Sequence, residues 1–202
     1  MGKIEMASRQ EQILSVVGEE TEAYLSSILA GLTQRLEDQM EIISSCFQTA
    51  LQASFDQVKT CPKKGKIEYI CISYLLSSLY TESFDFKIDF YNSDFYLDER
   101  ECESYFSLPQ CFDYAGDFAF IKKTMQKKLI RVMDYEVWTQ VYLFQVSRLK
   151  ALKSLITTLV ESMDFSLYAS FLSKTAQVIY GEYMGSGELI MDYGQLQIKA
   201  ED

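Results

Sequence analysis

The chain has 202 residues, nearly half of them hydrophobic, and a formal net charge of −10. This composition excludes disorder over most of the chain, and the acidic balance disfavours nucleic-acid binding because phosphate contacts need a basic surface. The sequence contains no histidine, which excludes Ser-His-Asp and Cys-His catalysis and every zinc site with an imidazole ligand.

No apolar run in the sequence reaches the length of a membrane span, and the first residues lack the apolar core of a signal peptide. The five cysteines are an odd number without close spacing, which favours reduced thiols over a disulfide framework. We therefore expect a cytoplasmic protein that contacts neither membrane nor nucleic acid.

The first predicted element is helical and covers residues 9–60. Ser8 and Glu11 have the spacing of a capping box. Apolar residues then recur from Leu25 to Val58 at an average step of about 3.67 residues, which matches a straight helix. We expect one very long helix or two nearly collinear helices, ending at the Cys-Pro-Lys-Lys-Gly segment 61–65.

Residues 66–81 also have apolar side chains at helical spacing, which predicts a second helix. Their first half, residues 66–75, is rich in isoleucine and tyrosine and could also be a strand. Periodicity alone leaves both alternatives open.

Residues 84–98 predict a β-hairpin. Phe84, Phe86, Ile88 and Phe90 alternate with Asp85, Lys87 and Asp89. This period of two is typical of a strand with one apolar face and one face in water. A two-residue loop at positions 92–93 would place Phe95 opposite Phe90 and Asp98 opposite Lys87. Because an isolated hairpin is marginally stable in water, we expect helices to cover its apolar face.

The rest of the chain is predicted to be mainly helical. Capping residues and apolar spacing indicate helices at 98–109, 117–133, 135–161 and 164–180, and a possible final strand at 188–193 that could join the hairpin.

Together these elements predict a mostly α fold of the α+β class: a bundle of long antiparallel helices with a small antiparallel hairpin or sheet around residues 84–98. We expect one domain over residues 1–202. It would comprise the helical segment 9–60, the hairpin-bearing segment 66–110, the helical segment 113–181 and the possible strand 188–193.

Charge is distributed unevenly along the chain. Residues 82–117 carry a net charge of −8, from ten acids and two bases, and residues 122–153 carry +6, from eight bases and two acids. The two segments are either solvated faces or complementary surfaces that dock within one chain or between two copies. A basic patch for an anionic partner is a third alternative, which the overall charge weakens.

The usual sequence signals of metal and phosphate sites are missing. The cysteines lack the two-to-four-residue spacing of a zinc site, and the hairpin aspartates lack the glycine and glutamate of a calcium loop. Gly181, Gly185 and Gly187 precede a strand pattern instead of a helix that could hold phosphate. We expect no metal and no cofactor.

The best candidate site lies in the predicted 135–161 helix. Gln145 and Arg148 fall inside its apolar arc, and a buried arginine needs a carboxylate or an anionic ligand. Arg148 could extend to solvent or pair with a structural carboxylate, with Glu22 and Glu182 as possible partners. Alternatively it could bind an acid group in a pocket with Trp138 and Tyr142 as walls.

These observations lead to three classes of function. We favour a non-catalytic interaction or regulatory module that acts through helical surfaces on a protein partner or a second copy. The alternative is a sensor that binds a small anionic or aromatic ligand near Arg148, Gln145, Trp138 and Tyr142. An enzyme using Asp, Glu, Tyr or Cys is the third class, and no catalytic arrangement is recognisable.

Overall fold

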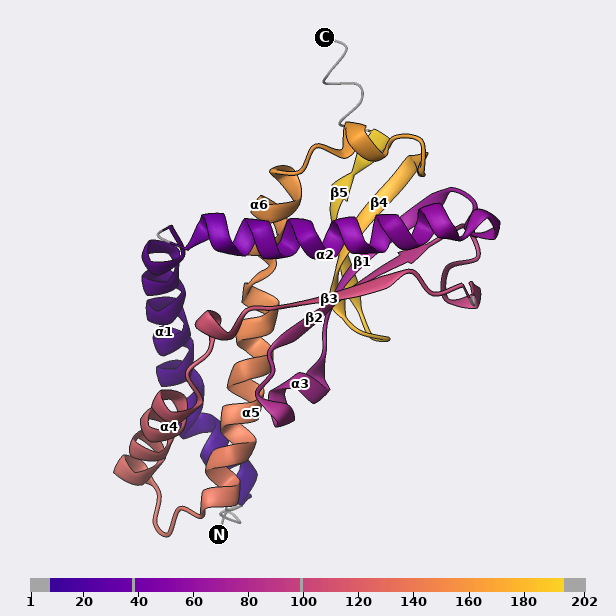
Figure 1. The fold of residues 1–202 in the computed structure, drawn as a ribbon. Helices are drawn as coiled ribbons and strands as arrows, with labels where there is room; N and C mark the ends of the chain where they lie inside the picture. Colours follow the sequence, from indigo (N-terminus) through magenta and orange to yellow (C-terminus); the bar gives the residue numbers. More distant parts are fainter. Residues whose placement is uncertain (1–7, 38, 99, 195–202) are drawn as a thin grey trace. The chain divides into compact units, whose positions relative to one another are not determined.

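A computed structural model describes residues 8–37, 39–98 and 100–194 of the chain (Figure 1). The fold is α+β and contains a five-stranded mixed sheet packed against helices. The predicted bundle of long antiparallel helices with a small hairpin is therefore wrong. The chain divides into two compact units, which are described separately below. Unit 1 comprises residues 1–38 and 110–148, and unit 2 comprises residues 39–109 and 149–202.

Unit 1 is helical. It contains α1 (Arg9–Glu37), α4 (Tyr114–Lys128) and α5 (Asp134–Ala151), the last of these up to Arg148. The apolar faces of the three helices meet in one core, as their amphipathic patterns require. Its fully buried members are Ile13, Val17, Ile121, Met125, Val137, Val141 and Phe144.

The predicted capping box at the start of α1 is confirmed. The Ser8 backbone N–H donates to Glu11 Oε2 at 2.7 Å, and the Glu11 N–H donates to Ser8 Oγ at 3.3 Å. The Arg9 guanidinium then bonds to both carboxylate oxygens of Glu136 on α5, at 2.8 and 3.1 Å. This arrangement ties the first turn of α1 to the first turn of α5.

Unit 2 is built on the sheet, whose strand order is β3-β2-β1-β4-β5. The strands are β1 (Ile67–Tyr74), β2 (Asp85–Tyr91), β3 (Glu103–Ser107), β4 (Leu172–Glu182) and β5 (Gly187–Asp192). The first three form an antiparallel meander, β4 lies parallel to β1, and β5 returns antiparallel to β4.

Helix α2 (Met40–Thr60) covers one face of this sheet (Figure 1). Ser54 Oγ lies 2.8 Å from Ser104 Oγ, and the rings of Phe47 and Phe55 contact those of Phe106 and Phe90. The apolar stripe predicted for this segment is buried, but it packs against a sheet instead of other helices. Unit 2 also contains α3 (Leu76–Thr81) and α6 (Lys153–Glu161).

The predicted hairpin is correct in its first strand and wrong in its second. Strand β2 pairs with β1 and with β3. The strand that follows β2 in the sequence and pairs with it is therefore β3, which begins at Glu103 and not at Asp94. Residues Phe95–Leu97 form a 3₁₀ turn. Asp98 is buried and bonds to Lys64 Nζ at 2.8 Å, so it does not face Lys87.

The second face of β2 is not in water, contrary to the prediction. Lys87 and Asp89 are both buried, and Lys87 Nζ lies 2.9 Å from Asp89 Oδ1. Lys87 also bonds to the Glu103 carboxylate and donates to the Tyr183 hydroxyl at 3.3 Å. Polar side chains on alternate positions thus mark an internal ionic cluster here.

Parts of three predicted helices are strands in the structure, while residues 76–81 of the predicted 66–81 helix do form a helix. Residues 67–74 form β1, so the strand alternative for that segment is correct, while 103–107 and 172–182 form β3 and β4. Strand β1 lies at the centre of the sheet, and residues on both of its faces are buried. Such a strand is a nearly continuous apolar run without alternation, and periodicity cannot distinguish it from a helix.

The two oppositely charged segments are linked by the Asp117–Arg148 pair at 2.7 Å. Lysines of the basic segment otherwise bond to acids outside the acidic segment: Lys122 to Asp134 of the basic segment itself, Lys127 and Lys128 to Glu20, and Lys153 to Glu188. All five cysteines are free thiols. None of the helices in the described ranges is both long and apolar enough to cross a bilayer.

Candidate functional site

The predicted site around Arg148 lies in the interior of unit 1. The Arg148 side chain is only 1% exposed, and its Nη2 donates to Asp117 Oδ1 at 2.7 Å. Its Nη1 donates to the Cys111 carbonyl oxygen at 3.2 Å. Gln145, also fully buried, donates to the other oxygen of Asp117. Arg148 and Gln145 thus share one internal carboxylate.

Aromatic rings surround this ion pair. The Arg148 guanidinium carbon lies 5.0 Å from the centre of the Phe144 ring and 5.7 Å from that of Phe112, both within cation–π range. Burial raises the pKa of Asp117, while Arg148 and Gln145 act in the opposite direction by stabilising the carboxylate. The negative charge of the Asp117 carboxylate therefore depends on Arg148 and Gln145.

Asp117 was not among the expected partners, since the sequence suggested Glu22 and Glu182. The spacing of α4 and α5 carried no signal that would pair positions 117 and 148. Among the residues that the structure describes, none bonds to Arg148 Nε or to Gln145 Oε1. The pairing explains why polar residues interrupt the apolar arc of α5. A ligand at Arg148 stays a prediction.

Trp138 and Tyr142 are not brought together with Arg148 as pocket walls. Trp138 precedes Arg148 by ten residues on one helix, which separates them by about 15 Å along the axis. Its side chain is 47% exposed and packs against the ring of Phe118 at 4.6 Å. Tyr142 is half-buried and lies six residues from Arg148, on the other side of the helix.

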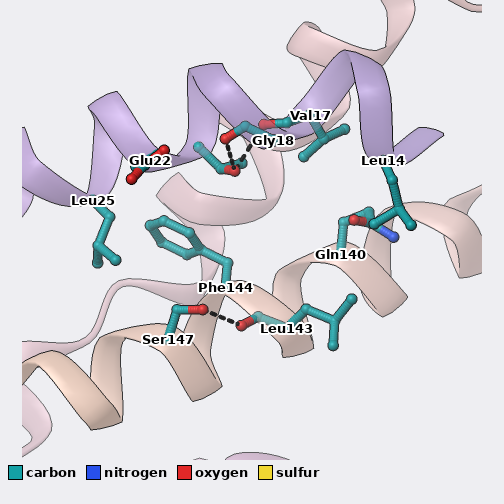
Figure 2. A pocket seen from close by; sticks show the side chains of 10 residues that line it. Leu14, Val17, Gly18, Glu22, Leu25, Gln140, Leu143, Phe144 and Ser147 are labelled. Carbon is teal, nitrogen blue, oxygen red and sulfur yellow. Dashed lines mark hydrogen bonds between the residues drawn. The ribbon is translucent and has the colours of Figure 1, made fainter. Parts of the chain in front are cut away.

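A concave surface occurs elsewhere in unit 1, between α1 and α5 (Figure 2). This groove has a volume of about 440 Å³. Figure 2 shows Phe144 reaching from α5 toward α1, with Leu14 and Leu143 at one end and Leu25 and Ser147 at the other. A second hollow of about 330 Å³ shares Leu14, Gln140 and Leu143 with it and continues to Arg9 and Tyr135. We call the two together the α1/α5 groove.

The α1/α5 groove has a largely apolar lining that is open to solvent. Leu14 on α1 is 49% exposed and Leu143 on α5 is 46% exposed. Tyr135 extends the apolar surface at the end near Arg9. Facing leucines left half-exposed on two helices mark an apolar surface that another apolar group could cover.

Gly18 deepens the groove on its α1 side. A Cβ atom at this position would meet nothing within 4 Å in the described part of the chain. A glycine inside a helix costs about 1 kcal/mol relative to alanine, and packing within unit 1 does not require it. The missing side chain lets another backbone approach α1 closely.

The two walls of the groove differ in charge. Helix α1 carries four acids and one base between Arg9 and Gly31, and Glu22 lines the groove one turn after Gly18. The α5 wall has no charged residue from Val137 to Ser147. Charges near the groove are therefore predominantly negative.

The sequence did not predict this groove. The apolar stripe identified in the sequence began at Leu25. The apolar spacing of Ile13, Leu14 and Val17 could have extended this stripe toward the start of the helix. Within residues 8–37, 39–98 and 100–194, no group of three or more cysteine, aspartate or glutamate side chains is placed to hold a metal ion.

Comparison with known proteins gives no relationship from which a role could be transferred. No protein-family model, no curated protein and no solved structure matches the chain. Function is therefore inferred from the geometry of the two units.

Proposed function

We propose that the chain is a non-catalytic interaction module in which the α1/α5 groove of unit 1 binds one amphipathic helix of a partner protein. The main support for this proposal is the pair of half-exposed leucines, Leu14 and Leu143, on either side of a continuous apolar groove. A helix with apolar residues at i, i+3, i+4 and i+7 presents the stripe that such a groove accommodates.

The dimensions of the groove support a helical occupant. From Arg9 to Leu25 it follows α1 for about 24 Å, which corresponds to roughly four turns of a partner helix. A helix laid over α1 and α5, opposite α4, would give unit 1 the four-helix arrangement in which apolar stripes are covered on all sides.

The charge around the groove supports a basic partner. Glu22 lies at the wall and neighbouring exposed acids continue along α1, while the central part of α5 is uncharged. Lysine or arginine residues beside the apolar stripe of the partner would face α1, and this complementarity would increase the association rate at low salt. We also propose a cytoplasmic location, which the five reduced thiols support.

Selection from a display library of helical peptides tests this proposal. Peptides selected on the wild-type protein should share an apolar stripe flanked by lysine or arginine. Their affinity should fall at least tenfold for Leu143→Glu, because a charge at the groove must be desolvated on binding. Leu167→Glu is a matched control in unit 2, where Leu167 is 70% exposed and lies outside the groove.

Two results would count against the proposal. One is a failure to select any helical peptide, and the other is equal affinity of the selected peptides for wild type and Leu143→Glu. Sedimentation of the unliganded protein covers the case in which a second copy occupies the groove. If wild type is a dimer and Leu143→Glu is a monomer, the occupant of the groove would be a second copy of the chain instead of a partner helix.

A further inference from the structure

A second candidate site lies in unit 2, on the sheet face that does not contact α2. Strand β2 presents Lys87 and Asp89 there, and the segment between β2 and β3 contributes Asp98 and Glu101. With Tyr183 and other neighbours these residues line a pocket of about 220 Å³. Nothing in the α1/α5 groove proposal requires this pocket.

The pocket is bordered by two buried ion pairs. Lys87 Nζ lies 2.9 Å from Asp89 Oδ1, and Lys64 Nζ lies 2.8 Å from Asp98 Oδ2. Replacing such pairs by apolar residues of similar size is often neutral or stabilising, so fold stability alone does not explain them. Two buried pairs at one small pocket therefore indicate a binding role.

Every N–H of the Lys87 ammonium is occupied, by Asp89, by Glu103 and by the Tyr183 hydroxyl. The Tyr183 ring also lies 4.6 Å from the ammonium. Lys87 therefore has no donor left for an anionic ligand. This saturation disfavours phosphate or carboxylate as the occupant.

The unmatched group at the pocket is an acceptor. Asp89 is 5% exposed, and no described residue donates to its Oδ2. Burial raises the pKa of Asp89, and the carboxylates of Glu103 and Glu101 add to the effect, while Lys87 acts in the opposite direction. A buried acceptor without a donor is costly, and a donor from a ligand would remove that cost.

The charge around the pocket also favours a cation. The charged side chains that line the pocket are three acids, Asp89, Asp98 and Glu101, and two bases, Lys64 and Lys87. The carboxylates do not converge as a metal-binding group. One ligand charge of +1 would balance the cluster, and the N–H groups of an ammonium would supply the missing donor.

We propose that this pocket binds a small molecule carrying a primary ammonium group, with Asp89 Oδ2 as its acceptor and Glu101 as a second carboxylate. Asp89 Oδ2 is shielded from solvent, so the ligand enters by displacing Met184, while the Tyr183 hydroxyl stays bonded to Lys87. Both residues belong to the turn between β4 and β5, outside the paired strands. Met184 is mostly exposed and has a left-handed backbone, with φ of 58°.

Titration with n-butylammonium chloride, followed by backbone amide NMR, tests the proposal. Wild type should show saturable shifts in β2 and in the β4–β5 turn. Tetramethylammonium, which has the same charge and no N–H donor, should not produce them. Asp89→Asn should weaken butylammonium binding at least about tenfold, since a hydrogen bond to a charged group is lost.

Asp85→Asn is the matched control, because Asp85 lies on the same strand and the same face as Asp89 but outside the pocket. The affinity of Asp85→Asn for butylammonium should match that of wild type. Glu101→Gln changes an exposed side chain and should weaken binding even if Asp89→Asn does not fold. Three results would overturn the proposal: no saturable shift in wild type, equal binding of tetramethylammonium, or wild-type affinity in both Asp89→Asn and Glu101→Gln.

Discussion

The buried pair between Arg148 and Asp117 leads to the sharpest prediction about stability. Arg148→Met keeps the length and apolar bulk of the side chain but removes its charge and its five N–H donors. Asp117, fully buried, would then retain the Gln145 amide without its cationic partner. We therefore expect unit 1 to lose roughly 3–5 kcal/mol, the usual cost of removing one partner from a buried ion pair.

Urea unfolding followed by Trp138 fluorescence measures this loss. Trp138 is the one tryptophan of the chain and lies on α5 within unit 1, so its emission reports on that unit. The two units can unfold separately, and a single global transition should not be assumed. The urea midpoint of the Trp138 signal should fall sharply with an unchanged slope.

A double variant separates the ion pair from the loss of packing. Asp117→Asn combined with Arg148→Met removes the stranded charge, so it should recover most of the stability that Arg148→Met loses. The double variant also gives a readout if Arg148→Met alone does not fold. A loss below about 1 kcal/mol for Arg148→Met would refute the structural role. An anionic-ligand site would instead leave the unliganded variant unchanged or more stable.

Two further predictions concern the groove and the second ion pair of unit 2. Gly18→Ala should stabilise unit 1 by roughly 0.5–1 kcal/mol in the same Trp138 assay, because the added Cβ meets no neighbour within 4 Å; a loss of stability would contradict this. It should also weaken binding of the selected peptides. For Asp98, burial alone would raise the pKa, but hydrogen bonds led by that from Lys64 hold the pKa below its usual value. The resulting stability is present above the unfolded pKa of about 3.9 and is lost as pH falls through the lower folded value. Circular dichroism melts of wild type should therefore fall more steeply below about pH 4 than those of Asp98→Asn, and parallel curves would contradict the reasoning.

Local signals in the sequence were sufficient for several helices. The capping box at Ser8 and Glu11 and the apolar stripe of α2 depend on neighbours within a few turns. The ends of such elements follow from side chains close in sequence. The start of α4 at Tyr114 was missed because Asp113, and not Asp117, accepts the capping hydrogen bond from Gly116.

Strands that pair across long stretches of sequence could not be predicted in this way. Strand β1 lies beside β4, which is about a hundred residues later, and no local pattern encodes that neighbour. Glu103 lies in the segment predicted as the 98–109 helix, whereas it bonds to Lys87 across the sheet. Runs such as Ile67–Tyr74 fit either element until their tertiary neighbours are known.

The candidate sites also depend on contacts between distant parts of the sequence, which local patterns do not encode. The pattern of α5 correctly marked Arg148 as unusual, but its partner Asp117 lies on another helix. The α1/α5 groove depends on which faces of two distant segments meet. The Asp89 pocket is lined by strand β2, the segment before β3 and the turn after β4, whereas the alternation of Lys87 and Asp89 alone indicated a face in water.

Methyl NMR of leucine-labelled protein with a selected basic helical peptide tests the central proposal most directly. We predict peptide-dependent shifts at Leu14, Leu25 and Leu143, which line the α1/α5 groove, and no shift at the exposed Leu167 and Leu189 of unit 2. Shifts confined to Leu167 and Leu189, or saturable binding without any change at Leu14 and Leu143, would contradict it.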